Sequence, residues 1–461
     1  MRKPFYILLF ILPLFIQAQT PWSKFLPLDY MWKNVGNIGF SDGEVYNTTI
    51  AFNPLGEPYI AFKDWYNAGH ATVMKYNGTA WVNVGNPGFS AQQIDAPGLA
   101  LDSLGEPYVI FSDLTNSGKA TVMKFGGTNW IPIGTPGFTT GMVSNSCLAF
   151  SPTDELFCAF ADETNYYKAT VMKFDGTNWV FIGIPGFSAG DVLGLSLSFS
   201  NSGSPYIGYS DDGNGFKSTV MKFDGLNWVN VGSSGFSNTS VDAVNLAFGL
   251  DDNPYVAYAK GTDPYKLVVK KFDGNSWGDV GPEDFSAGRA NYHSLAISPS
   301  GKPYVAYVDG GNLDRVTVMR FDGSNWMNVG TPGFSDGTAL FTSIAFNPID
   351  ATVYVAYRDS GNLGKASVMK YDSVFVGIKE PLESKFSLYP NPVTTNLTIN
   401  INNFSGINSF IEIYESRGEK IFETETNQNR VILNVEKYPA GIYIIKIKTE
   451  ISNWIGKFCK H

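Results

Sequence analysis

Tryptophan recurs at a fixed interval along most of this chain. Steps of 49 residues separate the members of the series Trp32, Trp81, Trp130, Trp179, Trp228, Trp277 and Trp326. One further step reaches Phe375, so the interval is kept seven times. A repeat of about 40–50 residues built from short apolar runs is typical of β-propeller blades, each of which packs only against its neighbours. The chain is therefore expected to fold as a ring of similar units.

Each repeat contains four runs of strand length, named here strands A to D in chain order. In residues 196–236 these runs begin at Ser196, Tyr206, Ser218 and Trp228, and Gly, Pro, Asn or Asp bounds each of them. Strands A and B are apolar on both faces, which predicts that both faces are covered. Strand C alternates in polarity and is expected to be less buried. Four strands per repeat predict an all-β fold, namely a seven-bladed β-propeller.

The links between strands fall into two sets. The A–B and C–D links are short and keep turn chemistry, as in Asn53-Pro-Leu-Gly-Glu-Pro58 and Asp175-Gly-Thr-Asn178. The B–C and D–A links are longer, and their composition changes from copy to copy. The two sets leave a blade at opposite faces, so binding is expected on the face formed by the B–C and D–A links. We call this the recognition face and the opposite one the turn face.

The two ends of the repeat predict how the ring closes. Strands A, B and C occur seven times, but there are eight D-like segments. The last of these, Asp372-Ser-Val-Phe375, has lost the Asp-Gly-x-Asn-Trp turn pattern. We therefore expect the N-terminal segment from Met31 to Gly36 to supply strand D of the final blade, which removes exposed sheet edges. The propeller is then expected over residues 31–376.

The chain begins with the features of a secretory signal peptide. Met1-Arg2-Lys3 is basic, the run from Phe5 to Ile16 is apolar, and Ala18 provides a small residue at a cleavage position. The apolar run is shorter than the ~20 residues that span a bilayer. Residues 1–18 are therefore expected to be a signal peptide, and the exported protein is expected to have no transmembrane segment.

Composition and charge narrow the class of protein. Aromatic residues make up 15% of the chain and charged residues 16%, with 48 glycines, which indicates a turn-rich β-protein rather than a disordered chain. The net charge of −9 argues against a nucleic-acid partner. Three cysteines are too few for a disulfide framework. Cys147 and Cys158 lie on neighbouring predicted strands and could cross-link, although two small buried apolar residues explain them more simply.

The repeat ends at residue 376, and residues 377–384 have the composition of a linker. Residues 385–461 contain several strands of alternating polarity, including Phe410-Ile-Glu-Ile-Tyr414. Their number and spacing predict a small Ig-like β-sandwich.

Four motifs in this last segment resemble the C-terminal sorting domain of the type IX secretion system, type A. In order they are Leu388-Tyr-Pro-Asn-Pro392 followed by Leu397-Thr-Ile399, Ile413-Tyr-Glu-Ser-Arg-Gly418, Ala440-Gly-Ile-Tyr443 and Lys457-Phe-Cys-Lys460. Cys459 occupies a position that is often aliphatic in that ending. The resemblance implies that the type IX machinery carries the protein through the outer membrane, usually with removal of the domain. It also implies release from the cell or attachment to its outer surface.

The repeats resemble exported bacterial propeller proteins with Trp-x-x-Val-Gly and Gly-Phe-Ser segments. That resemblance implies a fold and little about a ligand. The tryptophans are expected to be core wedges between blades, because their strict register and apolar setting need nothing more.

An aspartate just after strand B is the most regular polar residue of the repeat. It occurs at Asp64, Asp113, Asp162, Asp211, Asp309 and Asp359, with Lys260 in the fifth copy. Six residues after each position comes His70, Lys119, Lys168, Lys217, Lys266, Arg315 or Lys365. Such pairs could form repeated ligand sites, but a loop cap with an ion pair explains them more simply.

Few features of the chain point to catalysis. The Asp-Gly-Thr-Asn-Trp turns resemble the Asp-box of sialidases but lack its upstream Ser, and no arginine occurs between Arg2 and Arg289. The three histidines are not in a metal-ligand spacing, and there is no nucleophile elbow, phosphate loop or Cys–His pairing. We therefore expect no catalytic residue, metal or cofactor, although two acids on the recognition face could hydrolyse a glycoside.

Aromatic residues at non-periodic positions of the variable links are the candidate ligand-binding residues. They are Trp65, Tyr66, Tyr166, Tyr167, Phe216 and Tyr265. Aromatic faces near Asp and Asn suit sugars or protein surfaces, although packing between loops explains them equally well. The sequence thus predicts an exported, non-enzymatic propeller that recognises a glycan or a protein at the cell surface. The alternatives are a secreted glycoside-active enzyme and a purely structural surface component.

Overall fold

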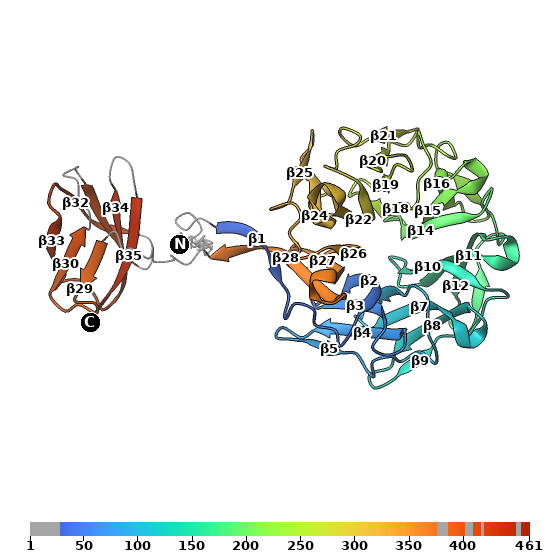
Figure 1. Ribbon diagram of the computed structural model, residues 1–461, viewed down its shortest axis with the longest axis horizontal. Coiled ribbons are helices and arrows are strands. Elements are labelled where there is room, and N and C mark those ends of the chain that lie inside the picture. The colour runs from blue at the N-terminus through green and yellow to red at the C-terminus, as the bar shows by residue number, and fades with distance from the viewer. Residues whose placement is uncertain (1–27, 376–385, 402–408, 416–418, 449–452) are drawn as a thin grey trace, which may run out of the picture. The chain divides into compact units, whose positions relative to one another are not determined.

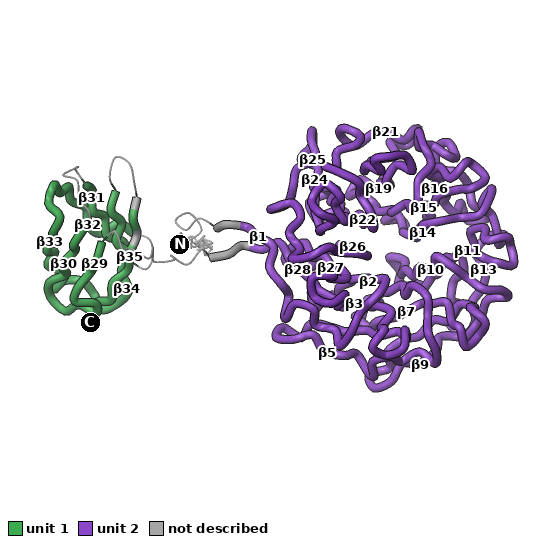
Figure 2. The backbone as a smooth tube through the Cα atoms, viewed as in Figure 1, with its two compact units in different colours: residues 1–29, 373–461 green, residues 30–372 purple. Residues whose placement is uncertain are grey.

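The computed structural model describes residues 28–375, 386–401, 409–415, 419–448 and 453–461. These residues form two compact units, one spanning Tyr30–Asp372 and the other including Ser373–His461 (Figure 2). The predicted signal peptide (1–18) and linker (377–384) lie outside the described residues. Within the described part of the chain, no helix is long and apolar enough to cross a membrane.

Seven four-stranded antiparallel sheets make up the first unit, each with its strands in the order A-B-C-D. Strand A of successive blades is β2 (Val45–Phe52), β6 (Gly98–Leu101), β10 (Val143–Phe150), β14 (Val192–Phe199), β18 (Asn245–Phe248), β22 (Ala290–Ile297) and β26 (Ala339–Phe346). Strand B is β3 (Pro58–Asp64), β7 (Pro107–Asp113), β11 (Leu156–Asp162), β15 (Pro205–Asp211), β19 (Pro254–Ala259), β23 (Pro303–Asp309) and β27 (Val353–Asp359). Figure 1 shows strand A of the blades nearest the centre of the ring.

The outer half of each blade is built in the same way. Strand C is β4 (His70–Tyr76), β8 (Lys119–Phe125), β12 (Lys168–Phe174), β16 (Lys217–Phe223), β20 (Leu267–Phe272), β24 (Arg315–Phe321) and β28 (Lys365–Phe375). Strand D is β5 (Trp81–Asn83), β9 (Trp130–Pro132), β13 (Trp179–Phe181), β17 (Trp228–Asn230), β21 (Trp277–Asp279), β25 (Trp326–Asn328) and β1 (Leu28–Asn34). Five B–C links contain a short 3-10 turn, η2 (Leu114–Asn116), η3 (Glu163–Asn165), η4 (Asp212–Asn214), η5 (Gly310–Asn312) and η6 (Ser360–Asn362). The predicted all-β, seven-bladed propeller is confirmed.

The ring closes by pairing the two ends of the propeller. The last sheet has the order β1-β28-β27-β26, so the N-terminal strand takes the place of strand D in blade 7. Strand β28 continues to Phe375 instead of turning, because the segment after Tyr371 lacks the Gly and Asn of a C–D turn. The predicted closure by the segment around Trp32 is confirmed.

Burial across a blade differs from the sequence-based expectation. Strand B is buried at nearly every residue, as expected, and β11 is buried at all of them. Strand A is only partly buried, as in β2, because it is the edge strand of its sheet, beside a cavity at the centre of the ring. Strand C, expected to be less buried, is buried over most of its first half, as in β4. The polar Thr72 in that half is buried because its hydroxyl donates a hydrogen bond of 2.8 Å to the Asp64 carboxylate.

The tryptophans join each blade to the one before it. Each indole stacks on the Phe of the preceding Gly-Phe-Ser or Gly-Phe-Thr segment, or on Phe285 in the Asp-Phe-Ser copy, with ring centroids 4.0–4.7 Å apart and interplanar angles of 9–12°. Each Nε1–H donates to a carbonyl at the end of the preceding strand D, at 2.7–2.9 Å. The Trp32 indole makes both contacts across the closure, with Phe334 and the Val329 carbonyl. The tryptophans are therefore interblade wedges.

The second unit contains two antiparallel sheets around one apolar core. One has the strand order β29 (Phe386–Tyr389), β30 (Asn396–Ile401) and β33 (Arg430–Asn434). The other has the order β32 (Lys420–Thr426), β31 (Ser409–Tyr414), β34 (Gly441–Lys448) and β35 (Asn453–Lys460). Fully buried side chains from both sheets, including Leu397, Ile413 and Ile445, fill the space between them. The predicted small β-sandwich is confirmed.

Candidate functional site

The B–C links on the recognition face share one hydrogen-bonded frame, which the aspartate after strand B organises. The Asp113 carboxylate accepts hydrogen bonds from the Thr115 backbone N–H (3.0 Å), the Asn116 side chain (2.8 Å) and the Thr121 hydroxyl (2.8 Å). The same arrangement recurs at Asp64, Asp162, Asp309 and Asp359, with Ser367 in place of Thr in the last. The loop-cap interpretation of these aspartates is confirmed.

The prediction of an ion pair between each aspartate and the base six residues later is wrong. None of the ion pairs among the described residues joins two members of these series. The base instead faces the D–A link, since His70 Nδ1 lies 2.8 Å from the Ser90 carbonyl oxygen and Lys266 donates to the Ala287 carbonyl at 3.2 Å. The carboxylate already accepts hydrogen bonds from the loop and from the strand C hydroxyl, so the base does not pair with it.

The structure does not bring the six predicted aromatic residues together. No ring contact within the described propeller joins any two of them, because they lie on the B–C links of blades 1, 3, 4 and 5. Tyr166 is 85% exposed, and Trp65, Tyr66, Phe216 and Tyr265 are also exposed, whereas Tyr167 is partly buried. Their part in binding therefore stays a prediction.

Three of the six occupy one special position of the loop frame. Tyr167, Phe216 and Tyr265 have φ of 54°, 57° and 53°, where blades 1 and 2 have Gly69 and Gly118. The carbonyl at this position accepts a hydrogen bond from the first residue of strand A of the next blade or, at Gly69 and Phe216, from a residue four positions before that strand. A bulky residue in the left-handed region costs about 1 kcal/mol or more. Because this backbone conformation costs free energy, it favours a function for these three side chains in addition to closing the loop.

Strand A carries a second irregularity, which sequence reasoning missed. In five blades its pairing with strand B shifts register near its start, as between Tyr46 and Thr49. The bulged residue has a positive φ and is Asn47, Asn145, Gly194, Tyr292 or Phe341. Asn and Gly tolerate this conformation, whereas Tyr and Phe do so at a cost. Aligning the copies at the 49-residue interval could have identified this position, because two copies have aromatic residues where the others have small ones.

These two residues belong to an aromatic cluster, defined here as Tyr46, Trp65, Tyr292 and Phe341. The ring centroids of Tyr292 and Phe341 are 4.8 Å apart, those of Phe341 and Tyr46 are 5.7 Å apart, and those of Tyr46 and Trp65 are 6.0 Å apart. Tyr292 and Trp65 are each 43% exposed. The cluster thus runs across blades 6, 7 and 1 on the recognition face, and it includes one predicted residue, Trp65.

A single ion pair accompanies the cluster. Arg358 of β27 pairs with Glu44, which lies just before β2, and its guanidinium carbon is 4.9 Å from the Tyr46 ring centroid. The Tyr46 hydroxyl donates to Glu44 at 3.2 Å. The Arg358 Nε atom is buried and has no hydrogen-bond partner. The pair therefore places a carboxylate that is 39% exposed and a guanidinium group whose side chain is 15% exposed beside the aromatic rings.

The cluster borders a cavity of about 360 Å³ lined by residues of blades 1, 2, 3, 6 and 7, which we call the channel cavity. Its lining includes Tyr292, Phe341, Asn47, Thr48 and Ser146. The Thr48 hydroxyl donates to the Phe341 carbonyl, which fixes the bulge of the neighbouring blade. A cavity of this size with aromatic and polar walls can hold a small polar ligand.

Burial disfavours the charged forms of two titratable residues of this cavity. Burial lowers the pKa of His293, more than nearby Asp242 raises it, and the backbone of Ala257 and Ala243 faces the imidazole. Burial raises the pKa of the Cys147 thiol to about 12. Cys147, Cys158 and Cys459 are all free, and Cys158 is buried as expected whereas Cys147 is only partly buried. No group of three or more His, Cys, Asp or Glu among the described residues could hold a metal ion.

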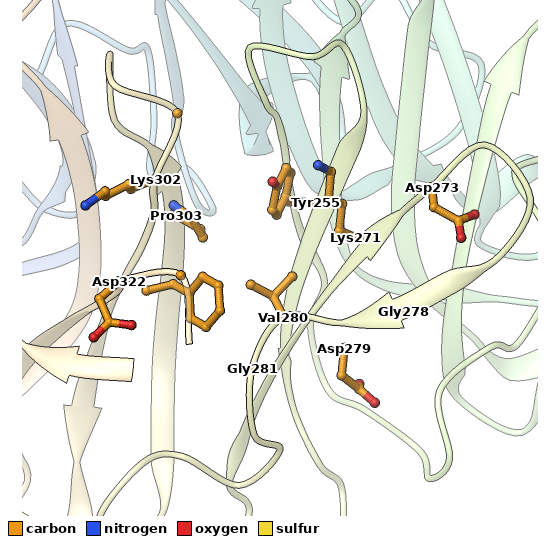
Figure 3. A pocket seen from close by; sticks show the side chains of 13 residues that line it. Tyr255, Lys271, Asp273, Gly278, Asp279, Val280, Gly281, Lys302, Pro303 and Asp322 are labelled. Carbon is orange, nitrogen blue, oxygen red and sulfur yellow. The ribbon is translucent and has the colours of Figure 1, made fainter. Parts of the chain in front are cut away.

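A second cavity, of about 460 Å³, lies between blades 5 and 6 on the turn face. Figure 3 shows Tyr255 and Lys271 of blade 5 on one side and Pro303 of blade 6 on the other. Gly278 of β21 lines it, where other copies have Val82, Ile131, Val180, Val229 and Met327. A Cβ added at Gly278 would meet nothing within 4 Å. The missing side chain thus accounts for part of the space.

We expect Gly278→Val to stabilise the propeller by about 0.5–1 kcal/mol, because valine restricts the unfolded chain and favours a strand. Chemical denaturation of the wild type and variant measures the change. Gly281→Val is the control, and it should destabilise, because Gly281 has φ +74° and its Cβ would lie 2.6 Å from Phe321. A loss of stability in Gly278→Val would contradict the packing explanation of this cavity.

The comparison with known families concerns the second unit. Residues 387–461 match the family described as secretion system C-terminal sorting domain. This segment is a secretion-system sorting domain. The sorting domain confirms the type IX resemblance, so the protein is exported and is either secreted or attached to the outer cell surface. The match does not extend to the propeller. The sorting domain therefore indicates where the protein is sent, but not what the propeller binds.

Comparison of whole structures finds other proteins of similar architecture. An ulvan lyase is 13% identical, with a TM-score of 0.48, over 74% of this chain and 96% of that one. A lectin solved with alpha-methyl fucoside is 15% identical, with a TM-score of 0.42, over 63% and 97%. An alpha-L-arabinanase from Penicillium chrysogenum is 12% identical, with a TM-score of 0.40, over 75% and 98%. No curated protein matches the chain. Similarity at this level transfers no ligand or activity to the propeller.

Proposed function

We propose that this exported protein is a non-enzymatic propeller that binds glycan through the aromatic cluster and the adjoining channel cavity. The single observation that carries the proposal is the break in the repeat at Tyr292 and Phe341. Both residues accept an unfavourable backbone conformation, with φ of 48° and 55°, and both border the cavity. Aromatic rings beside polar groups suit the apolar faces and hydroxyl groups of sugars.

A glycan array probed with the exported chain tests this proposal. We expect binding to at least one glycan and a roughly tenfold loss of affinity in Tyr292→Asn or Phe341→Asn, because each variant removes one stacking ring. Asparagine is the matched substitution, since Asn47 and Asn145 occupy the same position with φ of 53° and 50°. The variants should therefore fold.

Two further variants separate this site from other surfaces. Leu104→Ala changes an exposed residue of the turn face and should leave binding unchanged. Tyr166→Ala removes the most exposed of the six predicted aromatic residues. If Tyr166→Ala abolishes binding while Tyr292→Asn and Phe341→Asn retain it, the ligand binds at blade 3 and the cluster is not the site.

A glycoside-active enzyme is the second candidate, and one observation favours it. Asp191 and Asp212 lie on adjacent links of blade 4, where the Asp212 backbone N–H donates to the Asp191 carbonyl at 3.0 Å. Burial, and secondarily the Asp212 charge, raises the pKa of the Asp191 carboxyl. A carboxyl with a raised pKa is suited to general-acid chemistry. Turnover of a polysaccharide panel that disappears in Asp191→Asn would support this candidate, and no turnover by the wild type would reject it.

A further inference from the structure

The channel cavity has no charged wall. Its described lining consists of aromatic, aliphatic, amide, hydroxyl and thiol side chains together with His293, and contains no Asp, Glu, Lys or Arg. His293 is 7% exposed, and burial disfavours its charged form. An anionic ligand entering this cavity would lose its hydration without meeting a compensating charge.

The Glu44–Arg358 ion pair beside Tyr46 is already balanced, and a further cation, Lys63, lies 5.3 Å from the Trp65 ring centroid, at the opposite end of the cluster from Tyr292. Arg358 is neutralised by Glu44, and no other described acid pairs with this guanidinium. A sugar hydroxyl both donates and accepts, so two neighbouring hydroxyl groups can contact the Glu44 carboxylate and the Arg358 guanidinium together. A uronate carboxylate or a sulfate ester only accepts, and Glu44 would repel it.

We propose that this site selects uncharged saccharide units, which stack on Tyr292 and Phe341 and place neighbouring hydroxyl groups against the Glu44–Arg358 pair. The inference rests on the proposed function, because it names the class of glycan bound there. It also assigns Glu44 a binding role that the sequence did not indicate, since the residue lies just outside strand A and an acid does not recur regularly at this position. The residues one, two and three intervals later are Gln93, Met142 and Asp191.

The inference is tested by whether a negative charge on the polysaccharide weakens or strengthens its binding. Affinity of the exported chain is measured for neutral polysaccharides and for polysaccharides bearing uronate or sulfate groups, at low and high salt. We expect the neutral ligand to bind preferentially, with an affinity that changes less than about twofold with salt, because screening acts only on net charges. Glu44→Gln should weaken the neutral ligand roughly fivefold, because the amide keeps one acceptor oxygen and loses the paired charge.

Glu57→Gln is the matched control. Glu57 pairs with Lys75 at 3.5 Å on the turn face, so the same substitution there should leave affinity unchanged. Preferential, salt-sensitive binding of an acidic polysaccharide that Glu44→Gln strengthens overturns this inference alone, and comparison of the uronate and sulfate ligands then identifies the acidic group. Absence of binding to any polysaccharide overturns the proposed function and this inference together. Thermal melting of each variant confirms that it is folded.

Discussion

Replacing Trp32 with alanine is expected to lower the free energy of unfolding of the propeller by about 3–5 kcal/mol, the usual cost of removing a large buried aromatic residue. The indole is 8% exposed, stacks on Phe334 at 4.0 Å and donates to the Val329 carbonyl at 2.7 Å. It also covers Gly330, where a Cβ would lie 3.1 Å from the indole ring. All three contacts join the N-terminal strand to blade 6, so their loss should loosen the closure as well as the core.

Trp179→Ala is the matched control for this prediction. Trp179 makes the same contacts with Phe138, at 4.7 Å, and with the Ile133 carbonyl, at 2.9 Å. Its strand, β13, pairs with the strand that directly precedes it in the chain, β12, whereas β1 pairs with β28 from the other end of the propeller sequence. Hydrogen exchange should therefore increase strongly along β1 and β28 in Trp32→Ala and remain slow there in Trp179→Ala. Equal exchange along β1 in the two variants would contradict closure by this strand.

Much of the fold could be predicted from the repeat because turn chemistry and tryptophan register are local properties. The position of strand D, the number of blades and the closing strand follow from where Trp, Gly and Asn recur. The burial of strands A and C could not be predicted from local polarity. Strand A is apolar on both sides but is the edge strand of its sheet, beside a central cavity. The polar Thr72 of strand C is buried because its hydroxyl donates a hydrogen bond to Asp64, eight residues earlier.

The candidate site was only partly predictable. Trp65 lies on a variable link, where an aromatic residue stands out from its neighbours. Tyr46 and Phe341 lie within or beside an apolar strand and look like ordinary core residues in a period-two pattern. A strand A bulge lies at Phe341 and directly after Tyr46, and a bulge cannot be recognised from the alternation of polarity in one strand. Comparison of equivalent positions across the seven copies, rather than along one copy, is what distinguishes them.

The aspartate of the B–C link offers the second large expected effect. Asp113→Ala should destabilise the propeller by about 3 kcal/mol, because it removes a buried carboxylate that accepts three hydrogen bonds and leaves their donors unsatisfied. The Thr121 hydroxyl, which donates to Asp113 at 2.8 Å, also accepts a hydrogen bond from the Gly137 backbone at 2.9 Å. One carboxylate thus holds the B–C link and, through Thr121, the D–A link. Chemical denaturation monitored by tryptophan fluorescence measures the loss.

Lys119→Ala tests the other half of the sequence pattern. Lys119 follows Asp113 by six residues, yet the two side chains form no ion pair in the described propeller, so its removal should change stability by no more than about 0.5 kcal/mol. A loss as large as that of Asp113→Ala would restore the ion pair that the sequence pattern predicted. The expected difference between the two variants means that the regular aspartates maintain the shape of the recognition face. Ligand contacts then fall to the positions where the repeat varies, namely the strand A bulges and the aromatic residues of the links.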